Sequence, residues 1–375
     1  MDFEWTEEQK LLADAAKSFF SENCKIDLVK ELMKGNSDNY LEELYRKIID
    51  LGWVSLIYPE KYGGMDGTFL DLYPIFVEMG KYVPIGLFNP HTALAGTIFT
   101  EYGEDVLKEK YLPSICQGEK IVTFGFYEKD SSFDDKSIGM RAIKQGDEYI
   151  VSGKKIFVPY LDMVDAIIVA AKTGERKNDI SLFVVDLNND FIKKIPLKTM
   201  IGDHQFLAVF ENVKIPLTNK IGIENEGLGI AEKLMSKIGI ANCGLMIGAM
   251  EKVISMTVEY VKERKQFEQV IGSFQVIQHA CVDMICIFEI AKIQTKLAAW
   301  KIANDIDYKK DVSMAKALCN DAALKIAKSS HQLHGAIGFT DEYDLHVFTK
   351  ALRSWSIIYG TSEEHRKIVA NEMNL

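Results

Sequence analysis

Residues 229–262 read GIAEKLMSKIGIANCGLMIGAMEKVISMTVEYVK, a stretch without proline in which apolar residues recur every three or four positions. An α-helix has about 3.6 residues per turn, so this spacing places the apolar side chains on one face. The stretch therefore predicts one long helix with a continuous apolar face. The residues that define this face are Ile230, Leu234, Ile238, Ala241, Leu245, Ala249 and Val253.

The rest of the C-terminal part has the same character. All eight prolines lie at or before Pro216, so residues 217–375 contain none. Proline is unfavourable inside helices, and its absence over such a length favours long helices. Apolar residues at helical spacing predict two more helices, at 274–304 and 312–333. We therefore expect a C-terminal helical bundle.

The middle of the chain differs in composition from both ends. Four short stretches there are rich in β-branched and aromatic residues, and each is bounded by Gly, Asp, Asn or Pro. Such stretches are typical of strands, and we expect them to form a small antiparallel β-domain. They are residues 146–159, 165–174, 179–187 and 206–216.

The N-terminal part is expected to be helical. Thr6 and Gln9 have the spacing of a capping box that opens a first helix. The predicted fold class is therefore mostly α with a middle antiparallel β-domain. We place an N-terminal helical domain at residues 1–120, the β-domain at 121–220 and a C-terminal four-helix bundle at 221–375.

Charge and composition restrict the classes of partner. The formal net charge of -10 at pH 7 argues against a nucleic acid or an anionic membrane surface as the main partner. No apolar run approaches the roughly 18 residues of a spanning helix, and the acidic start MDFEWTEEQK does not resemble a secretory signal. The six cysteines are scattered without a CxxC pair, which favours buried thiols in a reducing compartment. We expect a cytoplasmic protein without membrane insertion.

The order of helices, small β-domain and helices, together with several local strings, is similar to the acyl-CoA dehydrogenase family. The similarity covers nearly the whole chain. The most specific strings are ERKQFEQVIGSFQ at 263–275 and HQLHGAIGFTDEYDL at 331–345. Further strings in the same order are TEEQKLLADAAKSFF (6–20), LGWVSLIYPEKYGGMDG (51–67), YLPSICQGEK (111–120) and GDEYIVSGKKIFV (146–158).

This resemblance implies a three-domain fold that binds FAD between the β-domain and the C-terminal bundle. Members of the family remove the α-proton of an acyl-CoA thioester with a carboxylate base, and the β-hydride passes to the flavin. The implied substrate is an acyl-CoA, and an electron-transfer flavoprotein is the candidate electron acceptor. FAD sites that straddle subunit interfaces also imply an oligomer.

The resemblance assigns several residues to FAD. Arg264 matches an arginine that pairs with the FAD pyrophosphate of a neighbouring subunit, a task suited to the guanidinium fork. Without that context, Arg264 would be interpreted as part of a solvated helix face. Gln332 and Gly335 match a Gln-x-x-Gly-Gly stretch near FAD, whose second glycine is Ala336 here. Further matches to FAD-contacting residues are Phe267, Gln275 and Thr361.

The catalytic base of the family is missing from its usual place. Relatives carry a glutamate directly before Gly-Thr, whereas this chain has Tyr359 there, in the string WSIIYGTSEEHRKIVA at 355–370. A phenol has a reference pKa of about 10 and is a poor base at neutral pH. Some relatives place the base on the helix that opens the C-terminal bundle, but Ile238 and Gly239 occupy the matching positions here. A gap could bring in Lys237, which is not a carboxylate either.

The β-domain departs from the family as well. The family's Thr-Glu-Pro-Gly-x-Gly-Ser-Asp loop reads YEKDSSFD at 127–134 and keeps only Glu128 and Asp134. The family's Trp-x-Thr/Ser string packs on the flavin and hydrogen-bonds it, but it reads FVP at 157–159. Proline has neither a hydroxyl nor an N–H to donate. The candidate flavin neighbours from this domain are Tyr127 and Phe157.

The histidines give weaker candidates. His91, in the string LFNPHTALAG, lies in the segment that lines the acyl pocket of relatives, and an imidazole can act as a base near neutral pH. The alternative is a packing histidine at a helix start. His334 is expected beside the FAD string, and His346 and His365 are expected at the surface or at an interface. The histidine spacing does not suggest a metal site.

Three interpretations follow. In the first, the chain is similar to the glutamate-lacking subunit of heteromeric bacterial acyl-CoA dehydrogenases, whose homologous partner subunit brings the base. In the second, it is a self-sufficient flavoenzyme with an unconventional base or reaction, with Tyr359 or His91 in the pocket. In the third, it is a non-catalytic scaffold that keeps the fold without FAD. The strings FVP and LHGxIGFT, together with the missing glutamate, favour the first.

Overall fold

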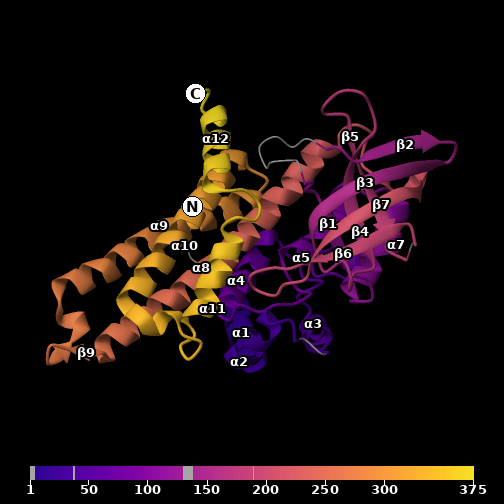
Figure 1. Cartoon of the computed structure of the whole chain (residues 1–375). Helices are drawn as coiled ribbons and strands as arrows, with labels where there is room; N and C mark the ends of the chain where they lie inside the picture. The colour runs from indigo at the N-terminus through magenta and orange to yellow at the C-terminus, as the bar shows by residue number, and fades with distance from the viewer. Residues whose placement is uncertain (1–4, 37–38, 130–137, 189) are drawn as a thin grey trace. The chain divides into compact units, whose positions relative to one another are not determined.

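The computed structural model describes residues 5–36, 39–129, 138–188 and 190–375 (Figure 1). The chain divides into two compact units, each built from separate stretches of sequence. The first, here called the helical unit, comprises residues 1–36, 69–84 and 239–375. The second, here called the sheet unit, comprises residues 37–68 and 85–238. The three-part division of the chain at residues 120 and 220 stays a prediction of the sequence.

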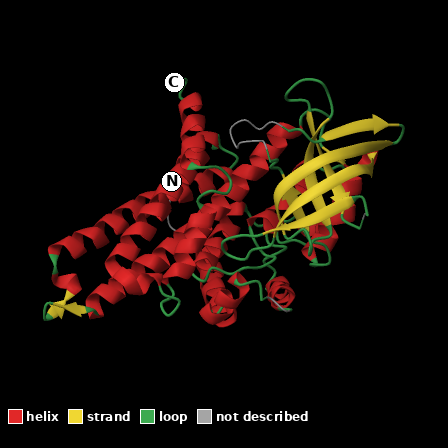
Figure 2. Cartoon of the chain, viewed as in Figure 1, coloured by secondary structure: helices red, strands yellow, loops and turns green. Residues whose placement is uncertain are grey.

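One mixed sheet forms the frame of the sheet unit (Figure 2). Its strands are β1 (Val122–Gly125), β2 (Arg141–Gln145), β3 (Glu148–Pro159), β4 (Ala166–Lys172), β5 (Ile180–Asp186), β6 (Ile192–Leu197), β7 (Gln205–Pro216) and β8 (Lys220–Ile221). Among the described residues the order is β6-β7-β3-β2-β4-β5-β8, and β1 also pairs with β4. The four strands predicted from the sequence are confirmed as β3, β4, β5 and β7. Most pairs are antiparallel, as predicted, whereas β4 runs parallel to β1 and β2.

The centre of this sheet is apolar on both faces. All residues of β4 except Lys172 are buried, and all residues of β5 except Asp186 are buried. Such continuous apolar runs occur where a sheet is covered on both sides. Short helices precede the sheet in the same unit. They include α3 (Tyr40–Asp50), α5 (Pro90–Ala95), α6 (Thr97–Tyr102) and α7 (Asp105–Cys116).

A β-bulge interrupts the pairing of β3 with β7. The register shifts between Lys155 and Val158. Phe157 lies within this irregularity with a φ of 56°, the left-handed region that bulky residues rarely adopt. Bulges bend a strand and re-aim side chains. Here the Phe157 side chain remains 56% exposed although both neighbouring segments of β3 are paired.

The helical unit contains the long helices predicted from the sequence. Its helices are α1 (Glu7–Asn23), α2 (Ile26–Met33), α4 (Phe69–Gly80), α9 (Gln275–Ala303), α10 (Lys309–His334), α11 (Leu345–Trp355) and α12 (Ser362–Glu372). Helix α8 (Gly227–Glu263) begins in the sheet unit and continues through the helical unit. The three predicted long helices are confirmed as α8, α9 and α10, with ends within three residues of those expected. The predicted capping box of Thr6 and Gln9 opens α1 and is also confirmed.

Two glycines allow α4 and α8 to pack closely in the helical unit. A Cβ atom on Gly80 would lie 2.0 Å from Leu245 O, and a Cβ atom on Gly248 would lie 1.9 Å from Val77 O. No side chain fits at such distances, so both positions require glycine. The expectation that no apolar run approaches the length of a spanning helix is wrong for α8, which is long and apolar enough to span a membrane, but 83% of its most apolar window is buried inside the protein. It is a core helix.

The cysteines only partly follow the expectation of buried thiols. All six are free, and Cys24, Cys116, Cys243 and Cys319 are buried. Cys281 is half-buried and Cys286 is exposed, both on α9. The expectation is therefore wrong for Cys286, which lies on a helix face that the rest of the described chain leaves open.

Candidate active site

The turn between α11 and α12 carries Tyr359, the residue at the predicted base position. Tyr359 and Gly360 both have a positive φ, 61° and 99° respectively. A left-handed tyrosine is unusual because its Cβ crowds the main chain, and such residues persist only where surrounding contacts hold them. Tyr359 is 9% exposed.

Four buried side chains supply such contacts, and we call Asn242, Lys316, Asn320 and His365 the carbonyl clamp. Trp355 O accepts hydrogen bonds from Lys316 Nζ at 3.0 Å and from Asn242 Nδ2 at 3.1 Å. Gly360 O accepts from Asn320 Nδ2 at 3.1 Å. Tyr359 O accepts from His365 Nε2 at 2.8 Å, so this imidazole carries a proton on Nε2.

The sequence did not predict the clamp, and its expectation for His365 is wrong. His365 is 3% exposed and hydrogen-bonds the turn, although it was expected at the surface or at an interface. One signal was present in the string SMAKALCNDAA at 313–323. A lysine and an asparagine stand there among small and apolar residues on a helix, which is typical of a buried polar pair.

Thr361, a predicted FAD neighbour, is the N-cap of α12. Thr361 Oγ1 accepts from Glu364 N at 3.3 Å, and Glu364 Oε2 accepts from Thr361 N at 2.7 Å. Thr361 Oγ1 also donates to Glu364 Oε2 at 2.9 Å. This capping box occupies the Glu364 carboxylate. The turn itself, residues 356–361, contains no carboxylate.

The second base position of the family also lacks a free carboxylate. Ile238 has no exposed surface. Lys237, one residue earlier on α8, forms an ion pair with Glu101 of α6. The Lys237 side chain is 16% exposed and that of Glu101 is 36% exposed. The Glu101 carboxylate, which lies beside this second base position, is therefore paired with the ammonium group of Lys237.

The sheet unit presents Tyr127 and Phe157 as candidate flavin neighbours. The main chain joins their strands, because Ile156 N donates to Tyr127 O at 2.8 Å. The Tyr127 ring packs edge-to-face on Phe126, with ring centroids 5.7 Å apart. Phe157 is exposed at the bulge, next to Pro159, which takes the place of the family's hydroxyl residue. The structure thus brings these two predicted residues to neighbouring segments of one unit.

A buried ion pair joins the same two segments. Lys155 Nζ lies 2.7 Å from Glu128 Oε1, and the Lys155 side chain has no exposed surface. Burial lowers the pKa of Lys155 to about 8, against the opposing effect of the Glu128 charge. Glu128 Oε1 and Oε2 also accept from Met140 N at 3.1 Å and Gly139 N at 2.8 Å. Glu128 therefore holds both ends of its loop together, while Asp134 lies outside the described residues.

At the far end of the helical unit, α8 leads into a small hairpin of β9 (Lys265–Gln266) and β10 (Gln269–Val270). Arg264 precedes it and makes no ion pair within the described residues. Phe267 at the tip has a φ of 53° and is 87% exposed, with its ring 6.2 Å from that of Phe274. Gln275 then begins α9. The three predicted FAD residues of this string are therefore neighbours in one exposed corner.

The other FAD string ends α10. Gln332 lies in the last turn of the helix, and Gly335 closes it with a φ of 64°. His334 Nδ1 donates to Ser330 O at 2.8 Å, and its ring packs on Tyr260 with centroids 4.4 Å apart. Burial holds the pKa of His334 below its ordinary value. This histidine therefore supports the local fold of the string.

His91 lies within the sheet unit and not on a surface. It follows the N-cap Asn89 at the start of α5 and is 3% exposed. Burial lowers its pKa to about 3, although a backbone hydrogen bond with Phe124 opposes the shift. An imidazole with such a pKa is a weak base, which supports the packing interpretation over the catalytic one.

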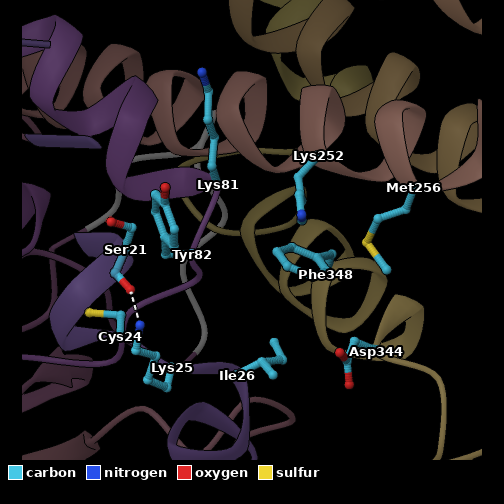
Figure 3. Close-up of a pocket in the computed structure, with 10 residues that line it drawn as sticks. All are labelled: Ser21, Cys24, Lys25, Ile26, Lys81, Tyr82, Lys252, Met256, Asp344 and Phe348. Atoms are coloured by element: carbon cyan, nitrogen blue, oxygen red, sulfur yellow. Dashed lines mark hydrogen bonds between the residues drawn. The ribbon is translucent and has the colours of Figure 1, made fainter. Parts of the chain in front are cut away.

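A separate pocket of about 440 Å³ lies in the helical unit (Figure 3). Its wall includes Lys25, Lys81 and Lys252 beside the apolar Ile26 and Phe348, but none of the predicted site residues. Two of its lysines have partners: Lys81 pairs with Glu78 at 2.8 Å, and Lys25 donates to Ser21 O at 2.8 Å. Within the described part of the chain, no group of three His, Cys, Asp or Glu residues is placed to hold a metal ion.

Comparisons with known proteins agree with this architecture. Residues 6–119 match the acyl-CoA dehydrogenase N-terminal domain, and residues 225–374 match the acyl-CoA dehydrogenase C-terminal domain. The chain belongs to the acyl-CoA dehydrogenase family. It is therefore an acyl-CoA dehydrogenase-type flavin oxidoreductase that acts on the CH–CH bond of acyl-CoA substrates, and its family depends on FAD.

Individual relatives cover the whole chain. The 3-(aryl)acrylate reductase of Clostridium sporogenes is 30% identical over 98% of this chain and 99% of its own length. The caffeyl-CoA reductase-Etf complex subunit CarC of Acetobacterium woodii is 27% identical over 98% of each chain. The structure of butyryl-CoA dehydrogenase from Megasphaera elsdenii aligns over 100% of both chains with a TM-score of 0.91 and 26% identity. This chain therefore has the complete fold of that butyryl-CoA dehydrogenase.

Proposed function

We propose that this chain binds FAD and is the base-lacking subunit of an acyl-CoA dehydrogenase-type enzyme, whose glutamate base comes from a homologous partner subunit. One observation carries the proposal: the turn at the base position presents Tyr359 and contains no carboxylate, while Glu364 is bound in the cap of α12. Such an enzyme removes the α-proton of an acyl-CoA thioester during α,β-oxidation. A carboxylate from outside this turn must therefore take that proton.

The chemistry of the phenol supports this assignment. A tyrosine with its reference pKa of about 10 is deprotonated to only about one part in a thousand at pH 7. A carboxylate with a reference pKa near 4 is almost fully available as a base. His91 does not replace it, because burial keeps its pKa at about 3 and its side chain is enclosed in the sheet unit.

The residues of the chain fit FAD at several points. Arg264 is exposed without an ion-pair partner in the described part of the chain, as a pyrophosphate ligand requires. Phe267 and Phe157 present exposed aromatic rings from strained backbone positions. We propose that each of these residues contacts a FAD, as do Tyr127, Gln275, Gln332, Gly335 and Thr361. Bound FAD would exchange a hydride with the β-carbon of the acyl group.

The partners of the enzyme belong to the same proposal. We expect an oligomer with a homologous acyl-CoA dehydrogenase subunit. In this oligomer, Arg264 and Gln332 would contact the FAD of a neighbouring subunit. An electron-transfer flavoprotein is the proposed electron partner, and the relative from Acetobacterium woodii is named as part of such a complex. A cytoplasmic location, expected from the cysteine usage, also remains a proposal.

An absorbance spectrum tests the proposal directly. The chain is purified alone and together with a homologous acyl-CoA dehydrogenase that carries a glutamate before Gly-Thr, and acyl-CoA thioesters are added without oxygen. We expect flavin reduction only in the co-purified sample, and its loss when the partner's glutamate before Gly-Thr is changed to Gln. Flavin reduction by the chain alone would contradict the partner-supplied base. A colourless, stable homo-oligomer would indicate a scaffold without FAD.

A second function is favoured by the presence of a phenol, in place of a carboxylate, at position 359. Both relatives from Clostridium sporogenes and Acetobacterium woodii are named as reductases, and reduction of an α,β-unsaturated acyl-CoA requires a proton donor at the α-carbon once the β-carbon has received its hydride. A phenol that keeps its proton at pH 7 is suited to donate it, and solvent then reprotonates the phenolate. Tyr359→Phe separates the two functions. It would slow reduction by about a hundredfold or more if Tyr359 is the acid, but would leave partner-dependent oxidation intact.

A further inference from the structure

The carbonyl clamp brings four polar side chains from three helices to one short turn. Asn242 comes from α8, Lys316 and Asn320 come from α10, and His365 comes from α12. Their exposed fractions are 1%, 0%, 1% and 3% in that order. Burial of a polar group is unfavourable unless it is hydrogen-bonded, so such a concentration needs a common reason. The common feature is that all four donate a hydrogen bond to a backbone carbonyl between residues 355 and 360. Lys316 also donates to the side chain of Asn320, another member of the clamp.

Lys316 is the most demanding member. Its Nζ donates to Asn320 Oδ1 at 2.7 Å and to Trp355 O at 3.0 Å. No carboxylate lies within ion-pair distance of it among the described residues. Burial lowers the pKa of Lys316, against the opposing effect of the nearby thiols of Cys243 and Cys319. Trp355 is the last residue of α11, and the carbonyl end of a helix favours a cation. The turn is thus held by a fully buried amino group whose two hydrogen-bond partners are neutral.

Asn320 links both ends of the turn. Its Oδ1 accepts from Lys316, whose Nζ also bonds Trp355 O before the turn. Its Nδ2 donates to Gly360 O after Tyr359. An amide can do both because it has an acceptor and a donor side. A carboxylate could keep only the first bond and would place an oxygen against Gly360 O.

We propose that the carbonyl clamp is a positioning device that fixes the path of residues 355–360, so that the backbone at position 359 is set independently of the side chain it carries. All its bonds to the turn go to the main chain, and none needs the phenol. The turn is therefore prepared to present whichever residue stands at 359. The clamp itself does not depend on the function proposed above, but its purpose, to present residue 359 to the acyl-CoA, does.

Hydrogen exchange tests the clamp without reference to FAD. The amides of residues 354–365 are compared in the wild type, Asn320→Asp and Asn219→Asp. Asn219 is a matched control, because its Nδ2 donates to Val184 O at 3.1 Å at a buried site in the sheet unit. We expect Asn320→Asp to speed exchange in this peptide by about tenfold or more. Unchanged exchange, or an equal effect of Asn219→Asp on the same peptide, would overturn the proposal.

His365 provides a second variant pair in case Asn320→Asp does not fold. His365→Leu removes the donor to Tyr359 O, whereas His365→Gln keeps an N–H of similar reach. Faster exchange at 354–365 is expected in His365→Leu and its restoration in His365→Gln. A structural role of the ring alone predicts that both variants exchange alike, and that result would contradict a positioning role.

A functional arm then tests the purpose of the turn. Tyr359→Glu is combined with either His365 variant, and the exchange of the α-hydrogen of an acyl-CoA with D₂O is followed by mass spectrometry. We expect Tyr359→Glu to gain this exchange, His365→Leu to remove at least about nine-tenths of the gain, and His365→Gln to restore it at unchanged acyl-CoA affinity. No gain in Tyr359→Glu, together with a clamp confirmed by amide exchange, would contradict the proposed placement of the turn and not the clamp.

Discussion

The Nζ atom of Lys155 lies 2.7 Å from Oε1 of Glu128, and along the chain Lys155 is two residues from Phe157 and Glu128 is one residue from Tyr127. The lysine side chain has no exposed surface, whereas that of Glu128 is 15% exposed. The pair therefore joins the two segments of the sheet unit that carry the proposed flavin neighbours, Tyr127 and Phe157. Its two members are not equivalent, because Glu128 has two backbone donors besides Lys155.

The two partners should differ when each is removed. Glu128→Gln leaves a fully buried ammonium without a charged partner, and we expect it to lower the free energy of unfolding by about 3–5 kcal/mol. Lys155→Met leaves a partly exposed carboxylate that keeps two N–H donors, so its effect should be smaller. Urea unfolding of both variants measures the difference. If Lys155→Met lowers the free energy of unfolding more than Glu128→Gln does, the prediction that the lysine depends more on its partner is wrong.

Because His91 is buried with a lowered pKa, we expect acid to destabilise the sheet unit. Its pKa is about 3 in the folded state, whereas an unperturbed histidine has a pKa of about 6.5, so the unfolded chain binds the proton first as pH falls. Its stabilisation is fully present above pH 6.5 and is lost between pH 6.5 and pH 3, up to about 5 kcal/mol. Thermal unfolding across this range should therefore be less steep with pH in His91→Gln than in the wild type. Parallel curves for the two proteins would contradict the buried neutral state.

Arg264 should control the affinity for FAD. Loss of a charge-assisted contact with a pyrophosphate costs about 1.5–3 kcal/mol, so Arg264→Ala should weaken FAD binding by roughly tenfold to a hundredfold. Arg176→Ala is a suitable control, because Arg176 is also exposed but belongs to the β4–β5 connection. The ratio of flavin to protein absorbance after dialysis measures retention. Equal retention in the two variants would return Arg264 to the solvated-helix interpretation.

The contribution of Thr361 to stability can be distinguished from its proposed contact with FAD, because Thr6 forms an equivalent capping box. Thr6 caps α1 and Thr361 caps α12 by the same reciprocal bonds. Each Thr→Ala change should cost about 1 kcal/mol of stability through the lost cap. Only Thr361→Ala should also change flavin retention and the flavin spectrum. If Thr6→Ala changes them equally, Thr361 acts through stability alone.

Most of the architecture could be predicted because its signals are local and repeated. The long helices follow from apolar spacing that persists over many turns, and β3, β4, β5 and β7 follow from apolar, β-branched stretches. Strands β2 and β6 were missed because most of their side chains are exposed and their sequences, RAIKQ and IKKIPL, lack a strong alternation. Short exposed strands depend on their neighbours for stability, so their own residues carry little signal.

The candidate site was predictable residue by residue only where a string matched a known pattern. That route gave Tyr359, Arg264 and Thr361, but it did not find the carbonyl clamp. The clamp depends on side chains from α8, α10 and α12 that meet only in the folded chain. Nothing local marks His365 as buried, since it stands in the polar string SEEHRK. Lys316 and Asn320 showed a weaker signal as polar residues among small ones.

The interleaved helical unit has a consequence for synthesis on the ribosome. Residues 1–36 and 69–84 belong to the same compact unit as residues 239–375, whereas the sheet unit is complete once residue 238 has emerged. At roughly 5–20 residues per second, the remaining stretch takes roughly 7–27 s to translate. During that interval α4 lacks the partner helix α8, against which its Gly80 packs at Leu245 in the finished protein. The nascent chain is therefore most in need of a chaperone at its oldest end.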